Sequence, residues 1–116
     1  MNLTRLAGIG LAVQLFVQTA GLEVALAAEW RFCIAPSSQE HKIYVTAPFF
    51  AVTSMEAMEG AFHLALERSG RRHDGVQCPT GANEQAVRVM RLHADEFNRQ
   101  MGLEVIPVDW RPAAAR

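Results

Sequence analysis

The two cysteines, Cys33 and Cys78, are the residues whose chemistry is most constrained by their spacing. They form no C-x-x-C motif, so neither thiol has a second thiol close in sequence to resolve a mixed disulfide. Their separation suits a structural bond instead, because a disulfide closing a loop of about 45 residues adds roughly 4 kcal/mol of stability in the chain-entropy model. We therefore expect one structural disulfide between them.

Two histidine–glutamate pairs have a spacing that suits metal ligands on a helix. His63 and Glu67 are spaced i, i+4. His93 and Glu96 are spaced i, i+3, and either spacing brings two side chains onto one helix face. A metal site needs further ligands, and neither an H-E-x-x-H motif nor a Cys/His cluster supplies them. We expect no metal or other cofactor, although these pairs are where a metal-binding enzyme would have to be built.

No other pattern in the chain indicates catalysis. There is no G-x-S-x-G nucleophile elbow, and a Cys–His enzyme would need a free thiolate, which the expected disulfide removes. Glu56 and Glu59 are explained by solvation on a helix, although the sequence alone leaves a pair of glycosidase carboxylates open. These features favour a non-catalytic protein over an enzyme.

Aromatic and arginine side chains are the better candidates for recognition. Trp110 is expected near the surface, and Tyr44 on the sheet face away from the helices, because exposed Trp and Tyr rings suit sugar or peptide binding. Arg71 and Arg72 begin a charged turn that can hold a carboxylate or a phosphate. The expected binding surface therefore consists of Tyr44, Trp110, Arg71 and Arg72.

Residues 1–27 predict a secretory signal peptide. Arg5 is an early positive charge, an apolar stretch follows over residues 6–17, and residues 25–28 form a small-residue end of the A-x-A type. The uninterrupted apolar run is shorter than the roughly 20 residues that a membrane-spanning helix needs. Cleavage after Ala27, with a cut after Ala28 as the alternative, is therefore expected to leave no stable membrane span.

Export determines the expected compartment and partners. Residues 28–116 form a single exported α+β domain, and the Ala- and Arg-rich composition suggests a bacterial periplasm or the medium, where a disulfide persists. Acidic and basic residues are interspersed at a net charge of −1 with no basic stripe, which argues against a nucleic-acid partner. An envelope protein or peptidoglycan is the expected partner.

Four strands are expected to support these residues. Alternation over residues 30–34 and β-branched and aromatic residues over 42–46 predict an antiparallel hairpin. Residues 75–78 predict a third strand and residues 103–110 a fourth. Pro107 indicates that the fourth strand lies at an edge or contains a bulge.

Two helices are expected between these strands. Thr53 and Glu56 fit a capping box at the start of the first helix, which ends near Ser69 with Gly70 after it. The second helix, closed by Gly102, has the clearest period in the chain. Its apolar stripe consists of Val87, Met90, Ala94, Phe97 and Met101.

The expected order of elements is β-β-α-β-α-β. Two right-handed crossovers would place both helices on one face of a four-stranded sheet, which is an α+β two-layer sandwich. The other face would carry Cys33, Cys78 and Val76. Small envelope modules that bind peptidoglycan also pack two helices on a four-stranded sheet, with a different strand order, and this likeness concerns the fold and not the function.

The expected function is that of a small exported, non-catalytic binding domain that recognises a protein or cell-wall partner. The compact domain, the sheet face without helices and the lack of a catalytic pattern support this interpretation. Two alternatives stay open. One is a small secreted hydrolase or metal-binding enzyme that uses the histidine–glutamate pairs. The other is an inhibitor or immunity-type protein, for which residues 39–42 form the one suitable loop.

Overall fold

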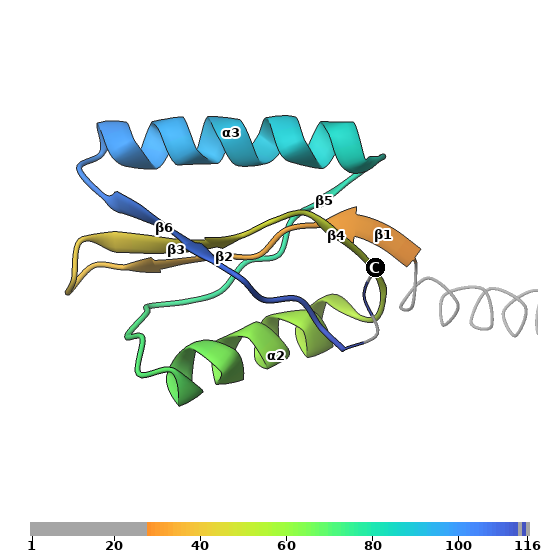
Figure 1. The fold of residues 1–116 in the computed structure, drawn as a ribbon, viewed down its shortest axis with the longest axis horizontal. Helices are drawn as coiled ribbons and strands as arrows, with labels where there is room; N and C mark the ends of the chain where they lie inside the picture. Colours follow the sequence, from red (N-terminus) through yellow and green to blue (C-terminus); the bar gives the residue numbers. More distant parts are fainter. Residues whose placement is uncertain (1–27, 114, 116) are drawn as a thin grey trace, which may run out of the picture.

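The computed structural model describes residues 28–113 and 115. The predicted signal peptide, residues 1–27, lies outside these residues. The described part of the chain contains two helices and six strands, which confirms the expected α+β class. Figure 1 shows the strands as a central layer with one helix on each side. None of the described helices has the length and apolar character needed to cross a membrane.

A long, bent hairpin forms the centre of the fold. Its first arm contains β1 (Ala28–Arg31) and β2 (Ile34–Ser37). Its second arm contains β3 (Lys42–Thr46) and β4 (Phe49–Val52). β1 pairs antiparallel with β4, and β2 pairs antiparallel with β3. An antiparallel hairpin is therefore confirmed, but the predicted pairing of residues 30–34 with residues 42–46 holds only at Ile34, because Trp30 and Arg31 pair with β4.

An extra residue in the second arm divides the hairpin between two sheets. Residues 32–33 on the first arm face residues 46–48 on the second. A bulge of this kind bends the strand and disrupts the ladder, and Pro48 has no N–H to donate. The result is two three-stranded sheets, β4-β1-β5 and β2-β3-β6, so the expected single four-stranded sheet is wrong.

The two remaining strands are short and lie at edges. β5 (Thr80–Gly81) pairs with β1, whereas the predicted strand at residues 75–78 makes only an isolated bridge through Gln77. β6 (Glu104–Val108) runs parallel to β3 at the edge of its sheet. The edge position predicted from Pro107 is confirmed, because proline is tolerated where one side of a strand needs no partner.

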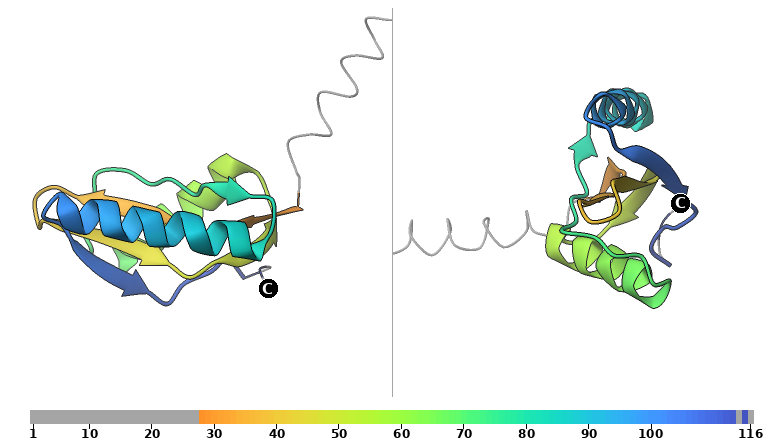
Figure 2. Two further views of the ribbon diagram at one scale, coloured as in Figure 1. Left: turned by 90° about the horizontal axis from the view of Figure 1, so that it is seen from above. Right: turned by 90° about the vertical axis from the view of Figure 1, so that its left-hand side faces the viewer.

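The two helices lie on opposite faces of the strand layer, so the expectation that they share one face is wrong (Figure 1). α2 (Met55–Arg68) connects β4 to β5, and α3 (Glu84–Gln100) connects β5 to β6. The end view in Figure 2 shows β5 and β6 on opposite sides of the layer. The connection from β4 to β5 and the connection from β5 to β6 therefore cross the strand layer in opposite directions. When both crossovers are right-handed, opposite directions place their helices on opposite faces of the layer.

Local sequence explains where the helices begin and end. Ser54 caps α2, since its Oγ accepts a hydrogen bond from the Ala57 N–H at 3.2 Å, one residue after the expected cap Thr53. Asn83 caps α3 in the same way. Gly70 follows α2 with a φ of 71°, a left-handed conformation that favours glycine. This turn directs the following loop back towards the strands.

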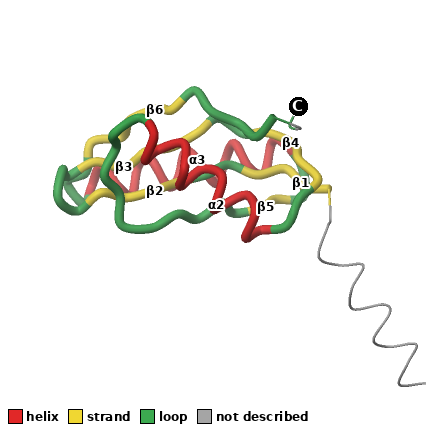
Figure 3. Tube along the Cα trace, turned by 90° about the horizontal axis from the view of Figure 1, so that it is seen from below, coloured by secondary structure: helices red, strands yellow, loops and turns green. Residues whose placement is uncertain are grey.

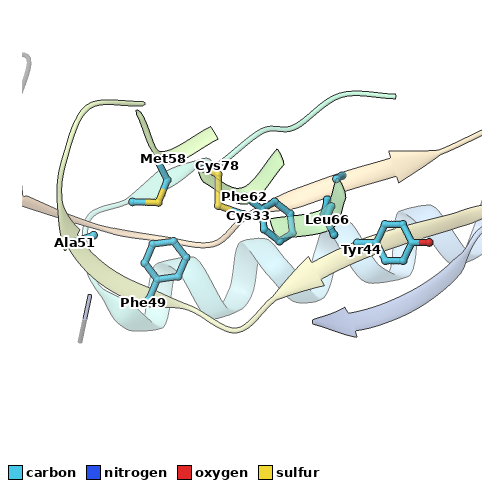
Figure 4. Close-up of a cluster of buried hydrophobic side chains, with 9 residues drawn as sticks. Cys33, Tyr44, Phe49, Ala51, Met58, Phe62, Leu66 and Cys78 are labelled. Atoms are coloured by element: carbon cyan, nitrogen blue, oxygen red, sulfur yellow. A yellow bond between two sulfur atoms is a disulfide. The ribbon is translucent and has the colours of Figure 1, made fainter. Parts of the chain in front are cut away.

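Each helix packs on its own core, and Figure 3 shows the strand layer between them from the side of α2. Neighbouring residues of a strand point to opposite faces, so Phe32 and Cys33 belong to different cores. The α3 core contains Phe32, Ile43, Val45 and Val87. The α2 core, drawn in Figure 4, contains Cys33, Ala35, Tyr44, Phe49, Ala51, Met58, Phe62, Leu66 and Cys78.

Candidate functional site

The disulfide between Cys33 and Cys78 is part of the α2 core (Figure 4). The two Cα atoms are 4.1 Å apart, and both residues are buried. The predicted bond is confirmed, but it lies under α2 and not on a face without helices. The expected face without helices does not exist, because the second crossover, from β5 through α3 to β6, returns across the strand layer and places a helix on its other face. A buried disulfide of this kind fits a structural role.

A polar pocket of about 490 Å³ lies beside the C-terminal end of α2. The end of β2 and the turn after it contribute one part of its wall, and the loop after α2 contributes the other. Figure 1 shows these two segments at the same end of the molecule. We call this cavity the α2-end pocket. Its lining residues are Ser37, Gln39, Glu67, Gly70, Arg71, Arg72, His73 and Asp74.

Two of the four predicted binding residues, Arg71 and Arg72, line the α2-end pocket. The Arg71 guanidinium carbon lies 5.5 Å from the centroid of the Tyr44 ring, which is a cation–π contact. Nη1 of Arg72 lies 3.5 Å from Oε1 of Gln39, at the outer limit of a hydrogen bond. The ring of Tyr44 therefore helps to hold the guanidinium group of Arg71 at the pocket.

Tyr44 is a buried residue and not a surface aromatic. Its side chain is part of the α2 core and only 3% of the residue is exposed, so the expected position on a face without helices is wrong. Figure 4 shows Tyr44 at one end of the core, with its hydroxyl directed away from the other rings. The hydroxyl donates to Oε2 of Glu40 at 3.2 Å. Burial, followed by this bond and the carboxylate charge, raises the pKa of Tyr44.

Trp110, the fourth predicted residue, packs in a different place. It is half-buried against the α2 core, with its ring centroid 5.0 Å from that of Phe62 and 6.1 Å from that of Phe49. It thus helps to cover the core and is not among the residues that line the α2-end pocket. The structure therefore brings Tyr44, Arg71 and Arg72 together and leaves Trp110 apart from them.

Ser37 is a further pocket residue that is not among the four predicted binding residues. It is 1% exposed, and its Oγ has no hydrogen-bond partner among the described residues. Leaving a buried hydroxyl unpaired costs about 1–3 kcal/mol, so a ligand atom that reached this group would make a bond that the described part of the protein does not. Strand parity was the available signal, because Ser37 continues the inward alternation of Cys33 and Ala35.

His73, which lines this pocket, lies within hydrogen-bond distance of His63. Nδ1 of His63 lies 2.7 Å from Nε2 of His73. The other nitrogen of His63 lies 3.2 Å from Oε1 of Glu67, and the other nitrogen of His73 lies 3.0 Å from the carbonyl oxygen of Arg71. Each of the four ring nitrogens therefore has a polar neighbour, and the contact between His63 and Glu67 is a hydrogen bond only when His63 is protonated.

The second histidine–glutamate pair is separate from the first. His93 and Glu96 are exposed on α3, on the other side of the strand layer from His63 and Glu67. His93 lines an apolar groove of about 510 Å³ between α3 and the strands, together with Phe32 and other apolar residues. Within residues 28–113, no group of three or more His, Cys, Asp or Glu side chains is arranged to hold a metal ion.

The α2-end pocket combines hydrogen-bond donors and acceptors without a paired nucleophile and base. Arg71 and Arg72 are donors, whereas Glu67 and Asp74 are acceptors. The Ser37 hydroxyl has no partner among the described residues, so no histidine of this region is hydrogen-bonded to it. The arrangement is suited to binding a polar ligand. Comparison of the chain with protein-family models, curated proteins and solved structures finds no match.

Proposed function

We propose that this protein is an exported, non-catalytic binding domain that recognises a protein or cell-wall partner through the α2-end pocket. The observation that carries the proposal is the pocket itself, a volume of about 490 Å³ whose lining includes two arginines and Ser37. The Oγ of Ser37 is buried and has no hydrogen-bond partner among the described residues. Ligand pockets commonly have volumes of about 300–1,000 Å³ with a few well-placed polar groups. A partner that inserts one polar group would fit this site.

The pocket is built on supports that hold its donors in place. Arg71 contacts the ring of Tyr44, and that ring is buried in the α2 core with its hydroxyl bonded to Glu40. Asp74 is attached to the end of β2, since its Oδ2 accepts from the Ser38 N–H at 2.9 Å. Donors and acceptors held in this way lose less conformational entropy on binding. The geometry therefore supports recognition by a largely preformed site.

The non-catalytic part of the proposal is supported by how the reactive side chains are used. The ring nitrogens of His63 and His73 each lie within 3.2 Å of another polar atom of the protein. Both cysteines are joined in the core. Ser37 has no base hydrogen-bonded to it among the described residues. Nucleophilic catalysis requires a nucleophile next to its base, so binding is the activity that these residues support best.

Export is supported by two independent features. The pattern of residues 1–27 is typical of a signal peptide. The buried disulfide between Cys33 and Cys78 is of the kind that forms and persists in oxidising compartments. Together with the Ala- and Arg-rich composition, these features favour the periplasm or the surroundings of a bacterium.

The test compares a pocket variant with a variant of equal charge change elsewhere. Arg71→Gln/Arg72→Gln alters the pocket, whereas Arg88→Gln/Arg99→Gln removes two exposed charges from α3. Each purified protein is used for pull-down from bacterial envelope extract and for co-sedimentation with purified peptidoglycan. We expect the wild type and the α3 variant to retain a partner that the pocket variant loses. If the wild type captures nothing in either assay, or if all three proteins bind equally, the proposal is wrong.

The same preparations test the enzymatic alternative. If His63, Glu67, His93 or Glu96 serves a metal-dependent hydrolase, elemental analysis of the purified protein should find stoichiometric zinc, and a hydrolase screen should find activity that a chelator removes. Either result would reverse the order of the two functions. We expect the metal content to be negligible and the screen to be negative.

A further inference from the structure

The charge of the α2-end pocket is balanced. Arg71 and Arg72 contribute two positive groups to its lining, and Glu67 and Asp74 contribute two carboxylates, so the count is even when the ring of His73, which also lines the pocket, is neutral. One carboxylate, Glu67, already contacts His63, and Asp74 contacts the backbone of Ser38. A ligand that enters this pocket meets cationic donors and anionic acceptors within the same cavity.

This balance distinguishes between two anions that arginine can bind. A phosphate dianion is recognised by clusters of arginines with an excess of positive charge, and the carboxylates of Glu67 and Asp74 oppose such a ligand. A carboxylate carries a single charge, and the planar fork of a guanidinium matches its two oxygens. The acceptors can then take N–H groups from the same ligand. The pocket therefore favours a molecule that carries one carboxylate close to an N–H donor.

We infer that the α2-end pocket binds the free C-terminal carboxylate of a peptide, an inference that rests on the proposed function. The last residue of a peptide presents a carboxylate and a backbone N–H within a few bonds of each other. In this arrangement Arg71 and Arg72 bind the carboxylate, and Asp74 or Glu67 accepts from the N–H. Capture of a chain terminus is a general mode of peptide recognition.

Ser37 provides an internal probe of this inference. Its buried Oγ has no partner among the described residues, so Ser37→Ala removes no bond that they make. A serine hydroxyl rotates to suit its partner. Because this Oγ is buried, we assign it as a donor to the bound carboxylate only once the side chains that cover it move aside on binding. Ser37→Ala should therefore leave the thermal midpoint unchanged or slightly raised, and it should weaken peptide binding by about 10- to 100-fold, the range of one hydrogen bond to a charged group.

The experiment is a calorimetric titration of the purified protein with three ligands. The ligands are trialanine with a free carboxylate, trialanine with a C-terminal amide, and inorganic phosphate. Loss of a charge-assisted bond corresponds to about 10- to 100-fold in affinity. We expect the amide to bind at least about 10-fold more weakly than the free acid, and phosphate to bind more weakly than the acid. Arg71→Gln should lower the affinity for the free acid by a similar factor, and Arg88→Gln should leave that affinity unchanged.

The outcomes separate failure of this inference from failure of the proposed function. Equal affinity for acid and amide, or tighter binding of phosphate, overturns the carboxylate assignment, as does absence of binding by all three ligands. The proposed function still stands in these cases if envelope capture depends on Arg71 and Arg72. An unchanged affinity in Ser37→Ala overturns the role given to Ser37. Preference for the acid that disappears in Arg71→Gln supports the inference directly.

Discussion

The two faces of the strand layer differ in how completely a helix covers them. The α2 core is a cluster of nine buried residues that includes three aromatic rings and the disulfide. The α3 core contains four buried residues, and an apolar groove of about 510 Å³ remains beside α3. Phe62 of α2 is fully buried, whereas Phe97 of α3 is 60% exposed. The difference indicates that the α2 face supplies most of the packing in the described residues.

The clear apolar period of α3 in the sequence does not mean that the helix is well buried. The second helix has the clearest apolar period in the chain, yet Phe97 and Met101 of that stripe are exposed. A period identifies a helix and the direction of its apolar stripe. It does not state how much of the stripe a neighbouring layer covers, because that depends on where the helix lies over the strands.

The largest expected effect compares the two phenylalanines directly. Phe62→Ala should lower the free energy of unfolding by about 3–5 kcal/mol, because it leaves a cavity in the α2 core. Phe97→Ala should change it by less than about 0.5 kcal/mol, because the side chain is mostly exposed. Urea unfolding of both variants measures the difference. Equal losses would mean that the two faces contribute equally.

Removing the disulfide tests how much the α2 core contributes to stability. Cys33→Ser and Cys78→Ser should each lower the free energy of unfolding by about 4 kcal/mol, since either change opens the same loop. The double variant should be little less stable than either single variant, because the bond is lost only once. Thermal unfolding under non-reducing conditions measures all three. Additive losses would show that the two sulfurs are not joined in the purified protein.

The close approach of Gly81 to Val87 of α3 allows the packing of α3 on the strands to be tested. In Gly81→Ala the new Cβ would lie 2.7 Å from Cγ2 of Val87 and 3.3 Å from its backbone nitrogen. Because helix backbone cannot move as a flexible side chain does, we expect a loss of about 1–3 kcal/mol. Gly75→Ala is the matched control, since nothing lies within 4 Å of its added Cβ. An unchanged melting temperature in Gly81→Ala would show that α3 shifts freely on the strands.

The smallest effect concerns pH and the pocket end of the α2 core. The pKa of Tyr44 is raised above the ordinary value of 10.0, first by burial and then by the Glu40 bond. Between the ordinary and raised pKa values the folded protein holds a proton that the unfolded chain has lost, so this contribution is complete below pH 10.0 and is lost as pH rises through the raised pKa. Tyr44→Phe should remove this dependence from alkaline thermal melts.

The tyrosinate absorbance measures the same pKa without unfolding the protein. Tyr44 is the only tyrosine in the chain, so the absorbance change on alkaline titration comes from one group. We expect its midpoint above that of the unfolded protein in denaturant. A midpoint equal to that of the unfolded chain would mean that Tyr44 is solvated and that the α2 core is open at this end.

Much of the candidate site could be predicted one residue at a time, but its assembly could not. Arg71 and Arg72 were identified from a charged turn, and the structure places both at one pocket. Ser37 was missed because a serine at the end of a strand carries no chemical signal until its burial is known. Trp110 and Tyr44 were expected to be exposed together, and both instead pack on the α2 core because the two faces of the layer are covered.

The sequence by itself determined the local features of this protein. The helices, the hairpin, the edge position of Pro107 and the pairing of the two cysteines follow from propensity, turn chemistry and composition. Only the tertiary structure decided which face each helix covers and which side chains meet at the α2-end pocket. The physical reason is that the face covered by a crossover helix depends on which edge of the strand layer the next strand joins. No local run of residues encodes that choice.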